Sequence, residues 1–214
     1  MSNADRTLIV FLLDRSGSMQ SIKSDVEGGF AAFVEEQRNA PGECTATLAQ
    51  FDDRYELVFS AIPIDEVGPL ALAPRGRTAL LDSMGTLITD TGARLHATPD
   101  DERPGTVIVA IMTDGMENAS REWTYPAIKS LVEQRTNENG WEFLYMGADQ
   151  DAIEVGVHLG VKRQQSVTYG KSKARDVMAA TSANISRHRA AKVQNPAAVM
   201  DGYSGEQRVS LADD

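Results

Sequence analysis

Residues 8–19 read LIVFLLDRSGSM and contain the clearest strand pattern of the chain. Its first six residues are all apolar, which predicts a strand buried on both faces, as in a parallel sheet covered by helices on each side. Asp14 ends this strand with a carboxylate, and Ser16 and Ser18 follow on either side of a glycine. A buried strand that ends in an acid and two hydroxyls predicts a polar site at the end of that strand.

The rest of the chain alternates between strand and helix patterns. A second uniformly apolar run, Val107 to Met112, predicts another central strand, and Asp114 follows it closely. The turn at 52–54 is too short for a crossover, so one pair of strands must be antiparallel. The expected strands are 8–13, 44–51, 55–62, 107–112, 141–146 and 165–169, and the expected helices are 26–34, 80–95, 125–137, 151–159 and 172–189. This order predicts a doubly wound, mostly parallel six-stranded α/β sheet with one antiparallel edge strand and helices on both faces.

The length of the chain fits one α/β domain with an appendage. Its 214 residues are 42% hydrophobic, enough to bury a sizeable core. The domain is expected to span residues 6–190. Residues 1–5 are set apart as a tag remnant or disordered N-terminus, and residues 191–214, which have no convincing period, as a C-terminal tail that drapes over the body.

Charge and cysteine content narrow the possible partners and the location. The formal net charge of −10 argues against a protein that coats nucleic acid or anionic membranes. The segment from Lys162 to Lys192 is basic, with eight Lys or Arg residues and one acid, and is interpreted as a solvated helix face. Cys44 is the only cysteine and is expected to be a buried, unreactive thiol. Because no apolar run is long enough to cross a membrane and no leader pattern is present, a cytoplasmic location is expected.

A topological argument brings distant residues together. If the hairpin lies on one side of the first strand and the later strands on the other, the strand order reverses between the first and fourth strands. Ligands bind at such a point, outside the carboxyl ends of the strands. Asp14 and Asp114 end these two strands, and the long irregular connection at 60–77 is expected to bring Thr78 to the same edge.

The chemistry of the residues at this edge indicates a metal site. Asp14, Ser16, Ser18, Thr78 and Asp114 offer only oxygen ligands, which suit Mg²⁺, with Mn²⁺ or Ca²⁺ also possible. Two carboxylates balance the charge of a divalent cation, so the cation would still attract one more anionic oxygen. The sequence therefore predicts binding of a protein partner that offers an Asp or Glu carboxylate.

The three motifs together resemble a known site. DRSGS at 14–18, Thr78 after a glycine at 76, and TDG at 113–115 are similar, in this order, to the metal-ion-dependent adhesion site (MIDAS) of von Willebrand factor A (VWA) domains. The resemblance extends over the element order from about residue 6 to 190. It implies that Ser16, Ser18 and Thr78 bind the metal through hydroxyls, that Asp14 and Asp114 act directly or through water, and that the domain binds proteins instead of catalysing a reaction.

Two other interpretations stay open. Haloacid-dehalogenase-like phosphatases also end the first strand of such a sheet in an aspartate, which attacks phosphorus, but they need a second Asp where this chain has Ser16. A VWA fold with a non-functional metal site is the other alternative, since each motif alone is also an ordinary turn or helix cap, with Thr78 as the N-cap of its helix.

Weaker signals surround the predicted site. Arg77 stands where VWA domains commonly have a second glycine, and a cation there would either weaken metal binding or contact the partner's acid. Trp123 fits a partner contact and equally fits a residue that packs at the start of its own helix. The histidines at 96, 158 and 188 are expected on helices away from the motifs. The candidates for a partner-binding rim are Arg77, Glu117, Arg121 and Trp123.

Overall fold

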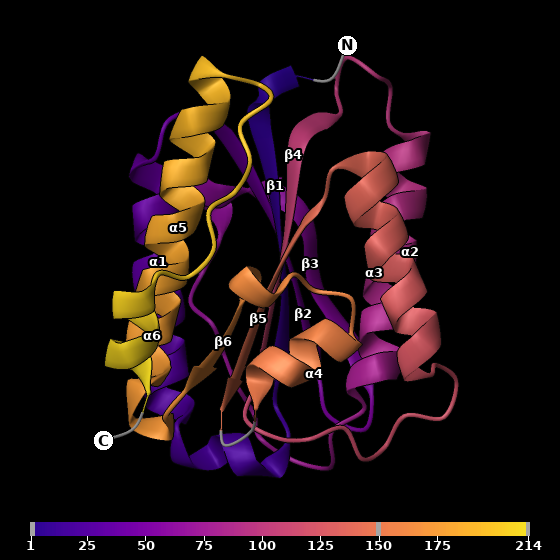
Figure 1. The fold of residues 1–214 in the computed structure, drawn as a ribbon, viewed down its shortest axis with the longest axis vertical. Helices are drawn as coiled ribbons and strands as arrows, with labels where there is room; N and C mark the ends of the chain where they lie inside the picture. The colour runs from indigo at the N-terminus through magenta and orange to yellow at the C-terminus, as the bar shows by residue number, and fades with distance from the viewer. Residues whose placement is uncertain (1–2, 149–150, 213–214) are drawn as a thin grey trace.

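The computed structural model describes residues 3–148 and 151–212 and is built around one six-stranded sheet (Figure 1). The strand order is β3-β2-β1-β4-β5-β6, and every neighbouring pair is parallel except β2 and β3. The strands are β1 (Asn3–Asp14), β2 (Glu43–Phe51), β3 (Tyr55–Pro63), β4 (Pro104–Thr113), β5 (Glu142–Ala148) and β6 (Ser166–Tyr169). The predicted fold class and the antiparallel edge strand are therefore confirmed.

Helices cover both faces of the sheet, which explains the uniformly apolar first strand (Figure 1). Alternate residues of β1 point to opposite faces. Phe11 packs edge-on against Phe30 and Phe33 of α1, while Leu12 belongs to the core on the α2 side. The helices are α1 (Lys23–Asn39), α2 (Leu80–Ala97), α3 (Tyr125–Asn139), α4 (Ala152–His158), α5 (Ala174–Gln194) and α6 (Gly205–Leu211). Helices α1 and α5 lie on one face, and α2, α3 and α4 contribute to the core on the other.

The two ends of the chain take part in the fold. Strand β1 already begins at Asn3, inside the stretch set apart as residues 1–5. At the other end, α6 follows α5 and lies beside it (Figure 1). Tyr203 is buried, its hydroxyl lies 2.7 Å from the Thr181 hydroxyl of α5, and the backbone carbonyl of Leu211 accepts a hydrogen bond from Gly170 N–H at 2.9 Å. The C-terminal residues therefore pack against α5 and the end of β6.

The basic segment is only partly a solvated face. Arg163, Arg175 and Arg187 are exposed, but Arg189 is 2% exposed. Its guanidinium donates to the backbone carbonyl and side-chain oxygen of Gln37, at 2.8 and 2.9 Å. The prediction of a solvated face is therefore wrong at Arg189, because this residue of α5 faces α1. Its guanidinium forms hydrogen bonds that hold the two helices together.

Other single-residue predictions agree with the structure. Cys44 is buried as a free thiol, and burial raises its pKa to about 11, so it is a poor nucleophile. His96 and His158 are exposed, and His188 is a packing residue at 3% exposure.

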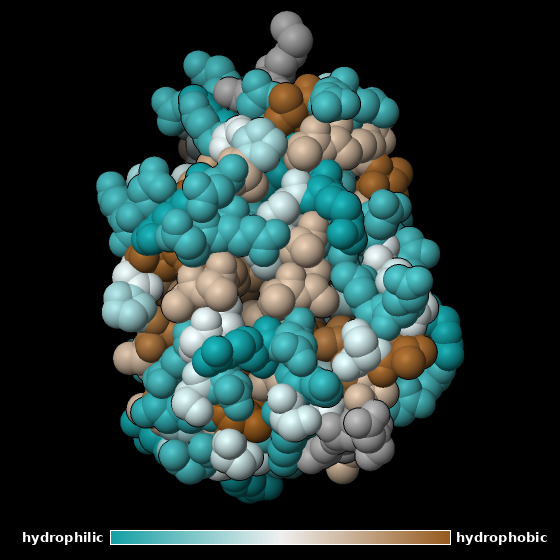
Figure 2. Space-filling view, turned by 90° about the vertical axis from the view of Figure 1, so that its left-hand side faces the viewer, coloured by the Kyte–Doolittle hydropathy of each residue, from teal (hydrophilic) through white to brown (hydrophobic). Residues whose placement is uncertain are grey.

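Within the described residues, no helix is both long and apolar enough to cross a membrane. The side of the molecule that carries α5 and α6 is mostly hydrophilic, with hydrophobic residues scattered between polar ones (Figure 2).

Candidate metal centre

The three predicted segments meet at the carboxyl edge of the sheet. After β1, a 3-10 helix (Gly17–Ser21) forms the turn that carries the two serines. The connection before α2 is hydrogen-bonded to this turn, because Arg75 N–H donates to the Arg15 carbonyl at 2.8 Å and Gly17 N–H donates to the Gly76 carbonyl at 3.3 Å. The long connection after β3 therefore returns to the edge at which β1 ends.

The structure brings the oxygen atoms of the predicted site together. The Ser16 and Ser18 hydroxyl oxygens are 3.1 Å apart, and the Ser18 hydroxyl donates to Asp114 Oδ1 at 2.5 Å. A Cβ built on Gly115 would lie 3.3 Å from Thr78 Oγ1 and 3.7 Å from Ser18 Oγ, so the hydroxyl of Thr78 lies beside the same group. The missing side chain of Gly115 leaves this space open.

Asp14 is a buried carboxylate at the base of the site. It is 0% exposed and accepts hydrogen bonds from Ser16 N–H and the Thr113 hydroxyl, both at 2.6 Å. Burial raises the pKa of Asp14 to about 6, and the negative charge of Asp114 adds to this, while the hydrogen bonds from Thr113 and Ser16 act in the opposite direction. The ionised carboxylate is therefore costly here unless a cation lies close to it.

Among the described residues, one oxygen of Asp114 has no hydrogen-bond donor. Its Oδ1 accepts from Ser18, but its buried Oδ2 has no hydrogen-bond partner among the described residues and faces the Lys171 ammonium at 3.6 Å. Asp114 thus offers Oδ1 beside the serine hydroxyls and keeps Oδ2 free of hydrogen bonds within the described residues, and carboxylate and hydroxyl oxygens are the hard ligands that Mg²⁺ prefers. Residues 3–148 and 151–212 contain no group of three or more His, Cys, Asp or Glu side chains placed to hold a metal, so this candidate depends on its hydroxyls.

A buried ion pair that the sequence did not predict lies beside the site. Arg15, the second residue of DRSGS, is 5% exposed, and its Nε donates to Asp52 Oδ2 at 2.9 Å. Arg75 Nε donates to the same oxygen at 2.8 Å, and Arg54 N–H donates to the other at 2.8 Å. Burial raises the pKa of Asp52, but the hydrogen bonds from Arg75 and its neighbours outweigh burial and lower it. The only sequence feature that could have indicated this ion pair is the acidic turn at 52–54, which follows the strand next to β1.

Two carboxylates near the motifs hold the loop that follows β4. Glu117 accepts hydrogen bonds from Leu81 N–H at 2.9 Å and from the Ser120 hydroxyl at 2.7 Å. Asp82 accepts from the backbone N–H groups of residues 121–123. Both acids therefore use their oxygens to attach this loop to the first turn of α2, and Glu117 has little capacity left for a partner.

Thr78 is held in place by the same loop. Its N–H donates to Asn118 Oδ1 and its carbonyl accepts from Asn118 N–H, both at 3.0 Å. The N-cap of α2 is Ala79, which makes no side-chain cap hydrogen bond, so the interpretation of Thr78 as the helix cap is wrong. The reason is that the backbone polar groups here are satisfied by Asn118 and Glu117, which leaves the Thr78 side chain to face the site.

The remaining rim candidates differ in exposure. Arg77 is exposed and donates to the Asn118 carbonyl at 2.6 Å, and Arg121 is exposed as well. Trp123 is half-buried and packs over Gly85 of α2, where an added Cβ would collide with the indole ring. Arg77 and Arg121 are therefore available to a partner, whereas Trp123 is used in packing.

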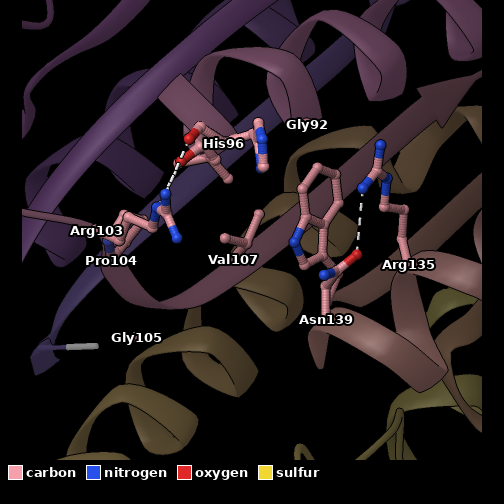
Figure 3. A pocket seen from close by; sticks show the side chains of 10 residues that line it. Gly92, His96, Arg103, Pro104, Gly105, Val107, Arg135 and Asn139 are labelled. Carbon is pink, nitrogen blue, oxygen red and sulfur yellow. Dashed lines mark hydrogen bonds between the residues drawn. The ribbon is translucent and has the colours of Figure 1, made fainter. Parts of the chain in front are cut away.

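A cavity of about 200 Å³ lies at the opposite edge of the sheet, away from these residues. Figure 3 shows side chains that line it, among them His96, Arg103 and Arg135. Residues at the starts of β4 and β5 and residues of α2 and α3 line this cavity. Arg135 lies over the Trp141 ring at 5.3 Å, and Arg103 Nε donates to the Leu95 carbonyl at 2.7 Å. The cavity takes no part in the candidate metal centre, which lies at the carboxyl edge of the sheet.

Comparison with known proteins supports the fold. No protein-family model matches this sequence, and no curated protein matches it. Among solved structures, proximal thread matrix protein 1 from the mussel byssus superposes with a TM-score of 0.58 and 17% identity, over 83% of this chain and 45% of that chain. Another structure of the mussel protein, described as having a zinc-occupied MIDAS motif, superposes with a TM-score of 0.55 at 17% identity, over 83% of this chain and 46% of that one.

Two bacterial structures give the same result. The von Willebrand factor type A protein from Catenulispora acidiphila superposes with a TM-score of 0.55 and 12% identity, over 86% of this chain and 43% of that chain. The vWF domain of the type V pili tip protein Mfa5 from Porphyromonas gingivalis has a TM-score of 0.57 and 10% identity, over 84% of this chain and 95% of that one. This chain thus spans less than half of the mussel and Catenulispora chains. It has the VWA fold, as its motifs predicted.

Proposed function

We propose that this VWA domain is a metal-dependent protein-binding module. The observation that carries the proposal is the convergence, from three separate segments, of three hydroxyls and two carboxylates at the carboxyl edge of the sheet, where Ser18 is exposed. Oxygen-only ligands favour Mg²⁺, with Mn²⁺ or Ca²⁺ as alternatives. Zinc occupies the MIDAS motif of the mussel neighbour, which supports a divalent cation in general. The residues that would hold the cation are Asp14, Ser16, Ser18, Thr78 and Asp114.

Each group has a distinct part in this proposal. The hydroxyls of Ser16, Ser18 and Thr78 would bind the cation, and Asp14 and Asp114 would balance its charge. When bound, the cation would supply a Lewis-acidic position that attracts one more anionic oxygen, such as an Asp or Glu carboxylate of a partner protein. Because the site lies at the carboxyl edge of the sheet and not in the cavity at the opposite edge, it suits a macromolecular ligand better than a small molecule.

We also propose that the module binds its partner without catalysis, in the cytoplasm. Both oxygens of Asp14 accept hydrogen bonds, from Ser16 N–H and from the Thr113 hydroxyl, and the carboxylate is fully buried. It is therefore badly placed to attack phosphorus, as a phosphatase would require. A cytoplasmic location is supported by the single unpaired thiol of Cys44, which suits a reducing compartment, and the net charge of −10 disfavours nucleic acid or anionic membrane as partners.

Metal binding can be tested directly on the purified protein. Calorimetric titration of the metal-stripped protein with Mg²⁺ or Mn²⁺ should show one site, and Thr78→Ala should weaken it at least about tenfold. Thr98→Ala is the matched control, because it removes the same hydroxyl beyond the far end of α2, where it only hydrogen-bonds the Arg94 carbonyl at 2.9 Å. No binding at millimolar cation, or equal loss in both variants, would contradict the proposal.

Partner binding needs a second experiment. The tagged protein should capture a protein from its native host in Mg²⁺ and release it in EDTA, while the Thr78→Ala variant should capture none. The captured protein should lose binding when one of its Asp or Glu residues is changed to an amide. Steady phosphomonoester hydrolysis that is abolished by Asp14→Asn would instead support the phosphatase alternative.

A further inference from the structure

A lysine from a distant part of the chain lies at the candidate metal centre. Lys171 begins a short 3-10 turn (Lys171–Lys173) between β6 and α5. Its Nζ is 3.6 Å from Asp114 Oδ2, and the two side chains are 36% and 0% exposed. Strand β5 lies between β4 and β6, so the lysine approaches Asp114 from two strands away.

The backbone on both sides of Lys171 is held in place. Gly170 N–H donates to the Leu211 carbonyl at 2.9 Å, and Lys173 N–H donates to the Gly170 carbonyl at 2.8 Å. One residue earlier, the Tyr169 hydroxyl donates to the Thr113 carbonyl at 3.4 Å, next to Asp114. The turn is therefore tied both to α6 and to the end of β4, which keeps the lysine at this edge.

The two oxygens of Asp114 face different groups. Oδ1 accepts from the Ser18 hydroxyl, on the side of the candidate ligands, and Oδ2 faces the ammonium of Lys171. A buried carboxylate is costly unless a positive charge lies near it. Lys171 supplies a positive charge at this distance from Asp114 Oδ2. A divalent cation that binds on the Oδ1 side would take over this role and would also be repelled by the ammonium.

We propose that Lys171 is an internal counter-cation that sets the cation affinity of this site. It balances Asp114 when no metal is bound and lowers the affinity for the metal, so that the site fills only when the free cation concentration is high or a partner carboxylate adds negative charge. This inference rests on the proposed function, because it assumes that the site binds a divalent cation.

The test compares two lysines of the same turn. Lys171→Met removes the charge at Asp114, and Lys173→Met removes an equal charge from a lysine that lies 3.8 Å from Asp176 Oδ2. Calorimetry with Mn²⁺ should show at least about fivefold tighter binding for Lys171→Met, whereas Lys173→Met should stay within about twofold of the unaltered protein. Lys171→Arg, which keeps the charge, should bind like the unaltered protein.

A second readout does not depend on the metal titration. In EDTA, Lys171→Met should melt at a lower temperature than Lys173→Met, because only the former leaves the buried Asp114 without its counter-charge. Added Mn²⁺ should raise its melting temperature more than that of the control. If Lys171→Met does not fold, Lys171→Gln replaces it in both measurements.

The outcomes separate this inference from the proposed function. Equal Mn²⁺ affinity in the Met variants of Lys171 and Lys173, or weaker binding in the former, would overturn the role of Lys171 while leaving metal binding intact. Absence of cation binding in the unaltered protein and in all variants would overturn the proposed function and this inference with it.

Discussion

Replacement of Asp14 by Asn should stabilise the metal-free protein while abolishing its response to metal. The carboxylate of Asp14 is fully buried, and its pKa rises from the ordinary 3.8 to about 6 in the folded protein. At pH values above 6, the folded state therefore holds an ionised group in an unfavourable place. Asparagine removes this charge and can still accept the hydrogen bond from Ser16 N–H.

The size and sign of the effect follow from the pKa. The rise from 3.8 to about 6 corresponds to about 3 kcal/mol of lost stability once the pH exceeds both values. Between these two values the folded protein binds more protons than the unfolded chain, so the free energy of unfolding falls as the pH rises. Because asparagine recovers only part of the hydrogen bonding of Asp14, we expect a gain of about 1–3 kcal/mol at pH 7.5, or about 3–10 °C in melting temperature.

The assay is thermal unfolding in EDTA and in saturating Mg²⁺, from pH 4 to 8. In EDTA the difference in stability between Asp14→Asn and the unaltered protein should grow as the pH rises from 4 to above 6. In Mg²⁺ the unaltered protein should be stabilised by mass action, whereas the variant should not respond.

The same substitution at Asp52 is the contrasting control. The pKa of Asp52 is lowered, because hydrogen bonds from Arg75 and the nearby charge of Arg15 outweigh its burial. Asp52→Asn should therefore destabilise the protein, by about 2–4 kcal/mol, since it removes the charged acceptor of Arg15 Nε and leaves the buried guanidinium with Glu56 alone. A loss of stability for Asp14→Asn in EDTA at pH 7.5, comparable with that of Asp52→Asn, would refute the reasoning.

Three further substitutions test the site and the core. Thr78→Ala should change the free energy of unfolding in EDTA by less than about 1 kcal/mol, because the N-cap of α2 is Ala79 and not Thr78; a larger loss in urea unfolding would show a structural role. Arg189→Met should cost about 2–4 kcal/mol in the same assay, since it leaves the buried acceptors of Gln37 unpaired, and a neutral result would contradict this. Gly85→Ala should displace Trp123, cost about 1–3 kcal/mol and shift the tryptophan fluorescence; unchanged emission would contradict the packing.

The fold class and the five ligand candidates could be predicted from the amino-acid sequence alone. Uniformly apolar strands require helices on both faces, and a short hairpin followed by crossover connections requires one antiparallel edge. Once the strand order reverses between β1 and β4, the ends of these strands must lie together, so Asp14 and Asp114 could be placed at one edge without coordinates. Local pattern and chain connectivity are enough for these conclusions.

The groups that surround those ligands could be identified only from the three-dimensional arrangement of the chain. Arg15 forms an ion pair with Asp52 of the hairpin turn, and Glu117 accepts hydrogen bonds from backbone N–H groups. Lys171 lies close to Asp114 although a strand separates β6 from β4. None of these pairings has a periodic or spacing signal, because each depends on strand register and side-chain direction in elements far apart along the chain. The physical reason is that apolar burial follows the local period of a strand or helix, whereas the partner of a charge depends on which segments the complete fold brings within a few ångströms of it.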